Sequence, residues 1–263
     1  MSHLWFKYSA NGVSNFVPKQ PVPTSSRMST KYFILSKNPS KSVADDDNTQ
    51  LYSINSSLTC ILPSTNMDYY AKHGLFEKNL IEWSKQLCSK DKNILDIGAH
   101  TGTYSLCLAP YAKHVYSFEP QKMTYYALCG SVALSNATNV TCHPVGLGSE
   151  SQVGIKDLYI RSQDGGGSSV HLLGDPVLAS EKIEIRTLDS YKYDSIGFIK
   201  MDVEDNELFV LQGAAETIRR CGHPKILFES NHENKALFDY ITNSLGYRSI
   251  VQIGGVSNMF LAE

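Results

Sequence analysis

The sequence predicts an α/β protein built on a mostly parallel sheet with helices on both faces. From residue 93 onward, short apolar runs alternate with stretches whose apolar residues recur at helical spacing. This alternation is typical of parallel sheets, because a helix carries the chain back to the edge where the next strand begins. The last two apolar runs have no helix between them, so we expect them to pair as an antiparallel hairpin.

Polar turns bound the expected elements. In chain order, strands are expected at 31–36, 50–54, 58–62, 93–98, 114–119, 140–147, 153–160, 181–189, 196–203, 225–230, 247–253 and 257–263. Helices are expected at 67–87, 103–112, 121–136, 206–220 and 233–244, where apolar residues recur every three or four positions.

The chain divides into two parts. Residues 1–44 are expected to form a partly flexible N-terminal extension, because their first 30 residues show no period and hold three scattered prolines. Residues 45–263 form the expected domain, which is long enough to enclose a substantial core.

Composition argues against several classes of protein. The formal net charge of −2 gives no basic excess, so we expect no nucleic-acid partner. The six cysteines form no CxxC pair, which argues against a zinc site. The N-terminus lacks the pattern of a signal peptide, and no window reaches the ~18 apolar residues of a membrane helix. We therefore expect a cytoplasmic protein without a membrane segment.

The turn after the strand at 93–98 is the first candidate site, since open α/β sheets bind ligands at such turns. In the stretch LDIGAHTGTYSL, Gly98 and Gly102 allow a tight turn. His100 stands where the dinucleotide fingerprint has the middle glycine that makes room for a pyrophosphate. Asp96 would repel a phosphate and suits an ammonium group. The candidate cofactor-binding residues of this turn are Asp96, Gly98, Ala99, His100, Gly102 and Thr103.

The next strand ends in YSFEP, which places Glu119 and Pro120 at its tip. Glu119 follows Asp96 by 23 residues, close to the ~20 expected for an acid that binds ribose hydroxyls. Three features fit S-adenosylmethionine better than NAD. Glu119 is an acid for a ribose, Asp96 is an acid for an amine, and the glycine turn between them lacks the geometry that binds a pyrophosphate. An NAD-dependent oxidoreductase and a nonenzymatic binding module remain as alternatives.

Six segments then complete a pattern. They are NILDIGAHTGTYSL, VYSFEP, HPVGLGSES, TLDSY, FIKMDVEDNELFVLQGA and ILFE, in that order. Together they resemble the FkbM family of S-adenosylmethionine-dependent methyltransferases over about residues 74–230. The resemblance implies a class I methyltransferase fold, which is Rossmann-like, with a mostly parallel seven-stranded sheet. It also implies O-methylation, often of sugars or other hydroxylated metabolites.

The resemblance also implies further cofactor-binding residues: Glu77, Val145 and Gly146. The family usually has glycine where this chain has Asp205, which affects the loop after the strand at 196–203. We expect an S-adenosylmethionine-dependent O-methyltransferase whose acceptor is a hydroxyl of a sugar or glycan. Another small hydroxylated metabolite or a nucleic acid is the alternative acceptor, and the oligomeric state is left open.

Four acids follow the strand at 196–203, and they fall into two pairs. Side chains alternate along a strand, so Lys200, Asp202 and Glu204 are expected on one face and are the candidate catalytic residues. An alcohol is a poor nucleophile until a base takes its proton, and a carboxylate can serve as that base. Asp202 is the principal candidate, either for this base or for an acid that contacts the cofactor, with Glu204 beside it. Asp205 and Glu207 are expected instead to favour the start of the next helix through its dipole.

Two further features bear on the site. Asp202, Glu229 and Asn231 offer oxygen ligands, so a Mg²⁺ site is an alternative, ranked below a metal-free mechanism. The stretch DGGGSSV at 164–170 is expected to be a loop on the substrate side.

Overall fold

The computed structural model describes residues 5–7, 15–17, 31–37, 39–43, 51–54, 58–172, 174, 176–230, 234–255 and 258–263. The expected boundary between extension and domain, at residues 44 and 45, lies outside these residues. None of the helices in the described part of the chain has the length and apolar character needed to span a bilayer.

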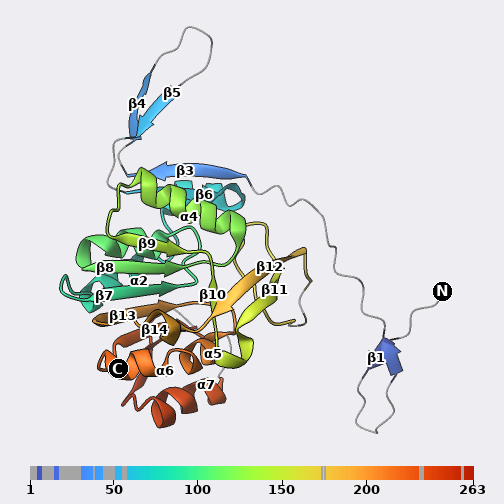
Figure 1. The fold of residues 1–263 in the computed structure, drawn as a ribbon. Helices are drawn as coiled ribbons and strands as arrows, with labels where there is room; N and C mark the ends of the chain where they lie inside the picture. Colours follow the sequence, from blue (N-terminus) through green and yellow to red (C-terminus); the bar gives the residue numbers. More distant parts are fainter. Residues whose placement is uncertain are drawn as a thin grey trace.

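A seven-stranded sheet forms the centre of the molecule (Figure 1). Its strands are β7 (Asn93–Ile97), β8 (His114–Phe118), β9 (Val140–His143), β13 (Ile196–Met201), β14 (Lys225–Glu229), β15 (Ile250–Gln252) and β16 (Met259–Ala262). They lie in the order β15-β16-β14-β13-β7-β8-β9. The pairs from β14 to β9 are parallel, whereas β16 is antiparallel to both β14 and β15. The expected mostly parallel sheet and its antiparallel C-terminal hairpin are confirmed.

Helices cover both faces of this sheet. They are α1 (Met67–His73), α2 (Lys78–Ser84), α3 (Thr103–Leu108), α4 (Lys122–Leu134), α5 (Glu207–Gln212), α6 (Ala215–Arg220) and α7 (Lys235–Asp239). Shorter 3-10 helices are η1 (Ser64–Asn66), η2 (Lys85–Leu87), η3 (Ala109–Tyr111), η4 (Glu150–Gln152) and η5 (Leu188–Tyr191), and η6 (Tyr240–Ser244) is a π-helical turn.

Two apolar clusters join these helices to the sheet. In one cluster, Val210 of α5 and Ile218 of α6 pack with Ile199 of β13. In the other, Ile81 of α2 and Leu108 of α3 pack with Phe198 of the same strand. Because Phe198 and Ile199 are consecutive, they point to opposite faces of the sheet. The core therefore consists of two layers, one on each side of β13.

Glycines interrupt two of the expected long helices, so those predictions are wrong in part. The expected helix 67–87 ends at Gly74, whose φ of 79° is readily adopted only by glycine, and resumes as α2. The expected helix 206–220 divides between α5 and α6 at Gly213, where a Cβ would lie 2.0 Å from the backbone oxygen of Gly148. That close approach of two backbones requires a residue without a side chain.

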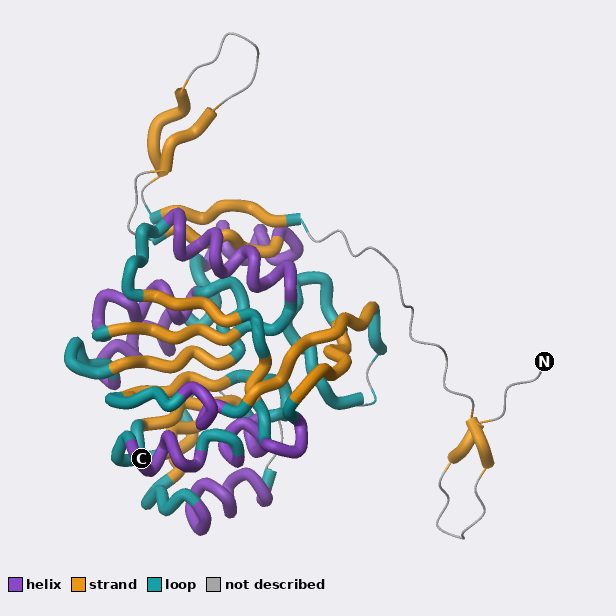
Figure 2. The backbone as a smooth tube through the Cα atoms, in the orientation of Figure 1, coloured by secondary structure: helices purple, strands orange, loops and turns teal. Residues whose placement is uncertain are grey.

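A small second sheet stands at one end of the main one. It contains β10 (Gly146–Leu147), β11 (Gly154–Ile160) and β12 (Ala179–Arg186), in the order β10-β12-β11. The expected strand 140–147 is thus two strands, because the chain leaves the main sheet after β9 and joins the small one at β10. Figure 2 shows loops and the small sheet gathered at one end of the main strands.

The remaining strands precede the main sheet. They are β1 (Trp5–Lys7), β2 (Asn15–Val17), β3 (Tyr32–Ser36), β4 (Pro39–Val43), β5 (Leu51–Ile54) and β6 (Thr59–Pro63), which pair antiparallel as β1 with β2, β3 with β6 and β4 with β5. Strand β6 is fixed to α4, because the backbone N–H groups of Thr59 and Ile61 donate to the hydroxyl groups of Ser135 and Ser131.

Candidate functional site

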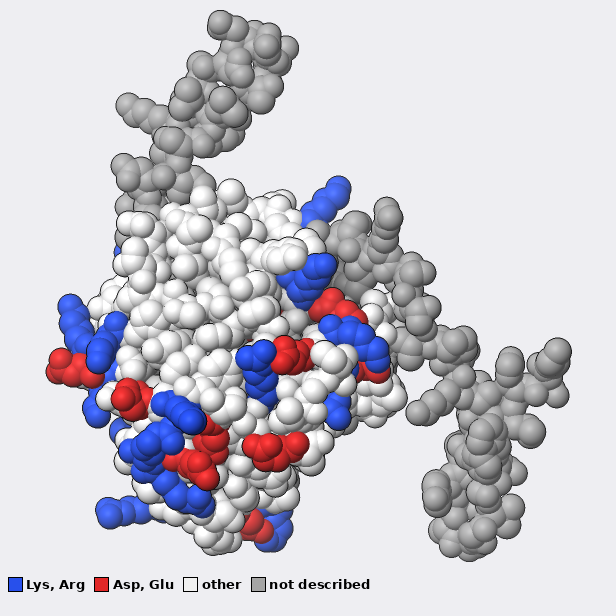
Figure 3. Space-filling view, viewed as in Figure 1, with Lys and Arg blue, Asp and Glu red and all other residues white. Residues whose placement is uncertain are grey.

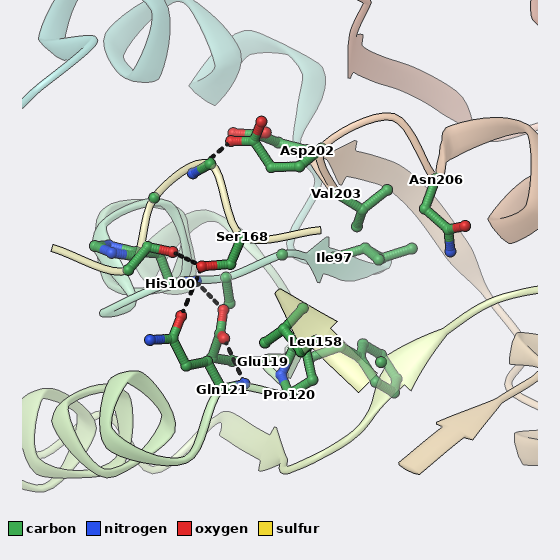
Figure 4. Close-up of a pocket in the computed structure, with 18 of the residues that line it drawn as sticks. Ile97, His100, Glu119, Pro120, Gln121, Leu158, Ser168, Asp202, Val203 and Asn206 are labelled. Carbon is green, nitrogen blue, oxygen red and sulfur yellow. Dashed lines mark hydrogen bonds between the residues drawn. The ribbon is translucent and has the colours of Figure 1, made fainter. Parts of the chain in front are cut away.

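A cavity of about 400 Å³ lies at the carboxyl ends of β7, β8 and β13 (Figure 4). Its volume falls within the roughly 300–1,000 Å³ that is typical of small-molecule sites. The turns after these three strands form part of its wall, and Leu158, Ile183 and Ile185 of the small sheet add apolar side chains. Open α/β sheets bind their ligands at this end of the strands.

Most residues expected from the sequence line this cavity. Among the expected cofactor-binding residues, the lining includes Glu77, Gly98, Ala99, His100, Thr103, Glu119, Pro120, Val145, Gly146 and Asp202. The expected catalytic residues Lys200, Asp202 and Glu204 line it as well. Two of the expected cofactor-binding residues, Asp96 and Gly102, are outside the described lining.

Asp96 is packed inside the protein and not at the cavity surface. Its side chain is 1% exposed, and its Oδ2 accepts a hydrogen bond from the hydroxyl of Ser105 at 2.5 Å. Its Oδ1 has no hydrogen-bond partner among the described residues. Burial raises the pKa of this carboxyl, although the nearby Lys200 opposes the shift. The position of Asp96 therefore does not support the expected direct contact with a bound amine.

The two glycines of the turn are required for different reasons. Gly98 has a φ of 75°, and a Cβ there would lie 1.8 Å from the backbone oxygen of Asp202. Gly102 has a φ of 91°, and a Cβ there would lie 2.6 Å from a methyl group of Leu128 on α4. Gly98 thus lets the turn after β7 touch the chain after β13, while Gly102 lets it pack on α4.

Glu119 is buried, and two backbone N–H groups hold its carboxylate. The N–H of His100 donates to Oε2 at 2.9 Å, and the N–H of Gln121 donates to Oε1 at 2.8 Å. Burial raises the pKa of Glu119 to about 7, against the effect of these two hydrogen bonds. Each carboxylate oxygen can accept a second hydrogen bond. The arrangement suits two adjacent hydroxyl groups, such as those of a ribose.

His100 connects the turn to the loop at 164–170. Its Nε2 lies 2.8 Å from the backbone carbonyl of Asp164, so Nε2 carries the proton and donates it. Burial lowers the pKa of His100, which favours the neutral ring. The imidazole therefore occupies the place that a dinucleotide-binding turn keeps open, and it anchors a neighbouring loop.

Lys200 and Asp202 form a partly buried ion pair at the end of β13. The Nζ of Lys200 lies 3.3 Å from Oδ2 of Asp202 and donates to the carbonyl of Gly98 at 3.2 Å. It also lies 5.1 Å from the ring centre of Tyr104. Burial opposes both charges, yet Lys200 holds the pKa of Asp202 below its ordinary value, and Asp202 holds that of Lys200 above its own. Both side chains are therefore charged at neutral pH.

Glu204 fixes the loop at 164–170 to the other side of the cavity. Its Oε1 accepts the N–H of Gly167 at 3.0 Å, and its backbone oxygen accepts the hydroxyl of Ser169 at 2.6 Å. The hydroxyl of Ser168 donates to Gln121 at 3.1 Å, on the side of β8. Residues 164–168 and 170 line the cavity, so this stretch is a wall of the site, and its place on the substrate side stays a prediction.

Asp202, Glu204 and Glu229 bring carboxylate oxygens within 4.8 Å of one another. Burial and the neighbouring Asp202 raise the pKa of Glu229 to about 9, so Glu229 is protonated at neutral pH and hydrogen bonds to Asp202. A shared proton and Lys200 thus already offset the charge of Asp202. Asn231, the third expected ligand of Mg²⁺, lies outside the described residues.

Glu207 lies at the start of α5, as expected, but it is buried. Its Oε1 accepts the N–H of Val203 at 3.0 Å, so it does cap the chain before the helix. Burial raises the pKa of Glu207 to about 8, against this hydrogen bond. The carboxyl is therefore mostly neutral at pH 7, and the expected attraction of its charge to the helix dipole is largely absent.

The free energy of unfolding is expected to fall as the pH rises from about 6.5 to 9. In this window Glu119, Glu207 and Glu229, with pKa values of about 7, 8 and 9, keep protons in the native state that the unfolded chain has lost. Buried histidines such as His100 act oppositely, but only below their ordinary pKa of 6.5. Urea titrations at pH 6.5, 7.5 and 8.5 measure the slope.

The Glu207→Gln variant should flatten this slope by up to about 1.4 kcal/mol per pH unit, because it removes one titrating group. Exposed Glu216→Gln is the control and should leave the slope unchanged. If the free energy of unfolding of the parent protein is constant or rises between pH 6.5 and 9, the raised pKa values of these buried carboxyls are contradicted.

Asp205→Gly is expected to raise the free energy of unfolding by about 0.5–1 kcal/mol. Asp205 has a φ of 71°, a conformation that costs most L-residues about 1–2 kcal/mol and glycine almost nothing. The greater freedom of glycine in the unfolded chain offsets part of this gain. Urea unfolding compares the variant with Asp91→Gly, an exposed position without positive φ, where no gain is expected. Equal effects at the two positions would contradict the proposed backbone strain.

Sequence reasoning missed several lining residues, and three of them come from another part of the chain. Asn66, Tyr70 and Phe76 lie on or beside α1, well before the first glycine turn. Asn206 is buried and donates to the carbonyl of Leu147 at 3.0 Å, which fixes the loop after β13. The aromatic pairs in DYYAKHGLF were a visible signal, but their apolar spacing equally fitted a core helix.

Comparison with known protein families identifies the family of this chain. The family model of the Methyltransferase FkbM domain matches residues 96–249. The chain is similar to the methyltransferase FkbM of Methylobacillus flagellatus KT, with 20% identity, 66% of this chain covered and a TM-score of 0.49. It covers 44% of that chain, less than half of its length.

Two other solved structures are similar at lower identity. An S-adenosylmethionine-dependent O-methyltransferase of Thermotoga maritima is 9% identical to this chain, with a TM-score of 0.47. The match covers 86% of this chain and 78% of the Thermotoga maritima chain. An rRNA methylase of Streptococcus thermophilus is 12% identical to this chain, with a TM-score of 0.44. The match covers 72% of this chain and 96% of the Streptococcus thermophilus chain. No curated protein matches the chain.

Proposed function

The chain belongs to the Methyltransferase FkbM domain family, and from this premise we propose that it transfers a methyl group from S-adenosylmethionine to a hydroxyl of a sugar or glycan. When bound, S-adenosylmethionine would supply a methyl group on a positively charged sulfur atom, which an acceptor oxygen can attack.

The charge of the cavity is the observation that supports this cofactor most. Five acidic residues line it: Glu77, Glu119, Asp164, Asp202 and Glu204. Lys200 is the one lysine or arginine in the described lining, and Asp202 already pairs with it. Such a cavity attracts an ammonium and a sulfonium group and repels the pyrophosphate of NAD. The side chain of His100 adds a steric reason against a dinucleotide.

Each lining residue has a proposed task. Glu119 accepts the ribose hydroxyls through the lone pairs that its backbone partners leave free, and Glu77 is a further cofactor contact. Asp202, whose pKa is lowered, stays ionised and stabilises the positive charge of the cofactor, while Lys200 holds it in place. Glu204 has a raised pKa and is therefore a better base for the acceptor hydroxyl than Asp202, the principal candidate from the sequence.

The charge of the surface and of the cavity bears on the acceptor. On the face drawn in Figure 3, basic side chains are interspersed with acidic ones and form no continuous basic stripe. A nucleic acid would bring phosphates to an acidic cavity, so we favour a neutral sugar or glycan. The cytoplasmic setting and the metal-free mechanism stay predictions.

S-adenosylhomocysteine is expected to raise the melting temperature, because a ligand that binds only the native state stabilises it. NADH should leave the melting temperature unchanged, since its pyrophosphate meets an acidic cavity and His100. The Glu119→Gln variant should bind S-adenosylhomocysteine about 1.5–3 kcal/mol more weakly in calorimetry, the range for hydrogen bonds to a charged group.

Glu119→Gln also tests the cost to the fold. One of the two buried N–H groups, from His100 or Gln121, would face the amide NH₂ instead of an oxygen, so we expect a loss of about 1–3 kcal/mol in stability. Glu181→Gln, outside the described cavity lining, is the control and should keep cofactor affinity. Stabilisation by NADH and none by S-adenosylhomocysteine would refute the proposed cofactor.

A further inference from the structure

An exposed aromatic cluster stands at the edge of the cavity, and the cofactor does not account for it. Tyr69 and Phe76 are 40% and 39% exposed, and their rings stack with centres 4.1 Å apart and planes inclined by 15°. His73 lies against Tyr69 with ring centres 4.9 Å apart. Phe76 also lines the cavity. We call Tyr69, His73 and Phe76 the aromatic rim.

The rim is held in place by the protein core. Tyr70 is buried, lines the cavity and meets Phe76 edge-on, with ring centres 4.9 Å apart. Tyr70 also packs against Phe33 and belongs to the apolar cluster beneath α4. Gly74 then turns the chain so that Phe76 returns to Tyr69. A stacked pair with such support is ordered before any ligand arrives, which lowers the cost of binding.

Polar groups adjoin the rim on the side of the cavity. Asn66 lines the cavity, and its Nδ2 donates to Oδ2 of Asp164 at 2.7 Å. Asp164 belongs to the loop at 164–170, and Glu204, the proposed base, holds this loop through the N–H of Gly167. The rim is therefore continuous with the place where we expect the acceptor hydroxyl, and hydroxyl groups find carboxylate and amide oxygens next to it.

We propose that Tyr69 and Phe76 form the surface on which a pyranose ring of the acceptor stacks while one of its hydroxyls reaches Glu204. This inference rests on the proposed methyltransferase function and assigns its acceptor subsite. A pyranose has one face of C–H groups, which packs on the negative face of an aromatic ring, and a periphery of hydroxyls. An aromatic metabolite would favour an enclosed apolar slot, whereas this rim is open to solvent.

The test uses methyl glycosides of glucose, mannose and rhamnose, whose anomeric groups are blocked, as acceptor probes. Saturation-transfer NMR with the full chain and S-adenosylhomocysteine should show enhancement of ring C–H protons of at least one glycoside. The Tyr69→Ala and Phe76→Ala variants should reduce that enhancement at least fivefold. Tyr69→Leu, which keeps apolar volume without a ring, should reduce it as well. Tyr126→Ala removes a tyrosine on α4 that is 53% exposed and lies outside the rim, and it should change nothing.

The same samples separate this inference from the proposed function. Each variant should keep the melting-temperature shift given by S-adenosylhomocysteine, which shows that fold and cofactor site are intact. Two results would overturn the acceptor subsite if the melting-temperature shift is normal. One is that the parent protein shows no NMR enhancement, and the other is that Tyr69→Ala shows the same enhancement as the parent. Either result would leave the cofactor assignment standing. Loss of the shift in the parent protein would instead count against the proposed function, while enhancement that depends on the rim would still support a sugar-binding surface.

Discussion

Replacement of Glu204 by glutamine is expected to lower the turnover number by roughly 10²–10⁴-fold, the usual share of general-base catalysis. Glutamine keeps an oxygen that can accept the N–H of Gly167, so the loop at 164–170 should stay in place. The amide cannot take a proton from an alcohol. Cofactor affinity should therefore change little, and single-turnover kinetics with a labelled methyl group would locate the loss in the chemical step.

Asp202→Asn should differ from this result in a measurable way. The amide no longer balances the charge of Lys200 and no longer attracts a sulfonium, so affinity for S-adenosylmethionine should fall together with turnover. Glu207→Gln is the matched control, because its carboxyl is already mostly neutral and a close isostere replaces it. Equal, mild losses of turnover in all three variants would show that none of these acids is the base. If a chelator abolishes the activity and Mg²⁺ restores it, the metal alternative is favoured.

Gly98→Ala is expected to cost about 2–5 kcal/mol of stability and to remove cofactor binding. This range combines the left-handed backbone, about 1–2 kcal/mol, with overpacking, about 1–3 kcal/mol. The added Cβ would lie 1.8 Å from the backbone oxygen of Asp202, and neither backbone can yield without separating the turn after β7 from the end of β13. Urea unfolding and calorimetry with S-adenosylhomocysteine measure the two effects.

Gly174→Ala provides the comparison for this variant. A Cβ at Gly174 meets no atom within 4 Å, and its φ is not positive, so both quantities should stay near those of the parent protein. Unchanged stability in Gly98→Ala would mean that the contact between the two strand ends is not as tight as the structure has it.

The fold was largely predictable because apolar spacing distinguishes the strands from the helices that alternate with them. Ile94, Leu95 and Ile97 belong to a short apolar run, which indicates a buried strand, and they lie in β7, which pairs with β8 and β13. The breaks at Gly74 and Gly213 were not predictable in the same way. Apolar spacing continues across both glycines, and only the approach of another backbone, that of Gly148, explains the second break.

Site residues that directly follow a strand were predictable from the sequence. The burial of a side chain inside the protein, and its packing against distant segments, were not. Glu119 and Asp202 line the cavity because they directly follow β8 and β13. Asp96 sits one residue before the end of β7, and strand alternation turns it into the protein, where Ser105 binds it. Phe76 could not be placed at the cavity, since that requires the turn at Gly74 and the packing of α1 against β3 and β6.

The protons held by buried carboxyls change the electrical balance of the folded chain. The formal net charge of −2 treats every acid as ionised. With pKa values of about 8 and 9, Glu207 and Glu229 are mostly uncharged at pH 7, so the native protein is close to neutral there. Unfolding at pH 7 releases both protons and makes the net charge of the chain more negative. The native protein should therefore focus at a higher pH than the same chain in urea, and near neutral pH little net repulsion keeps its copies apart in solution.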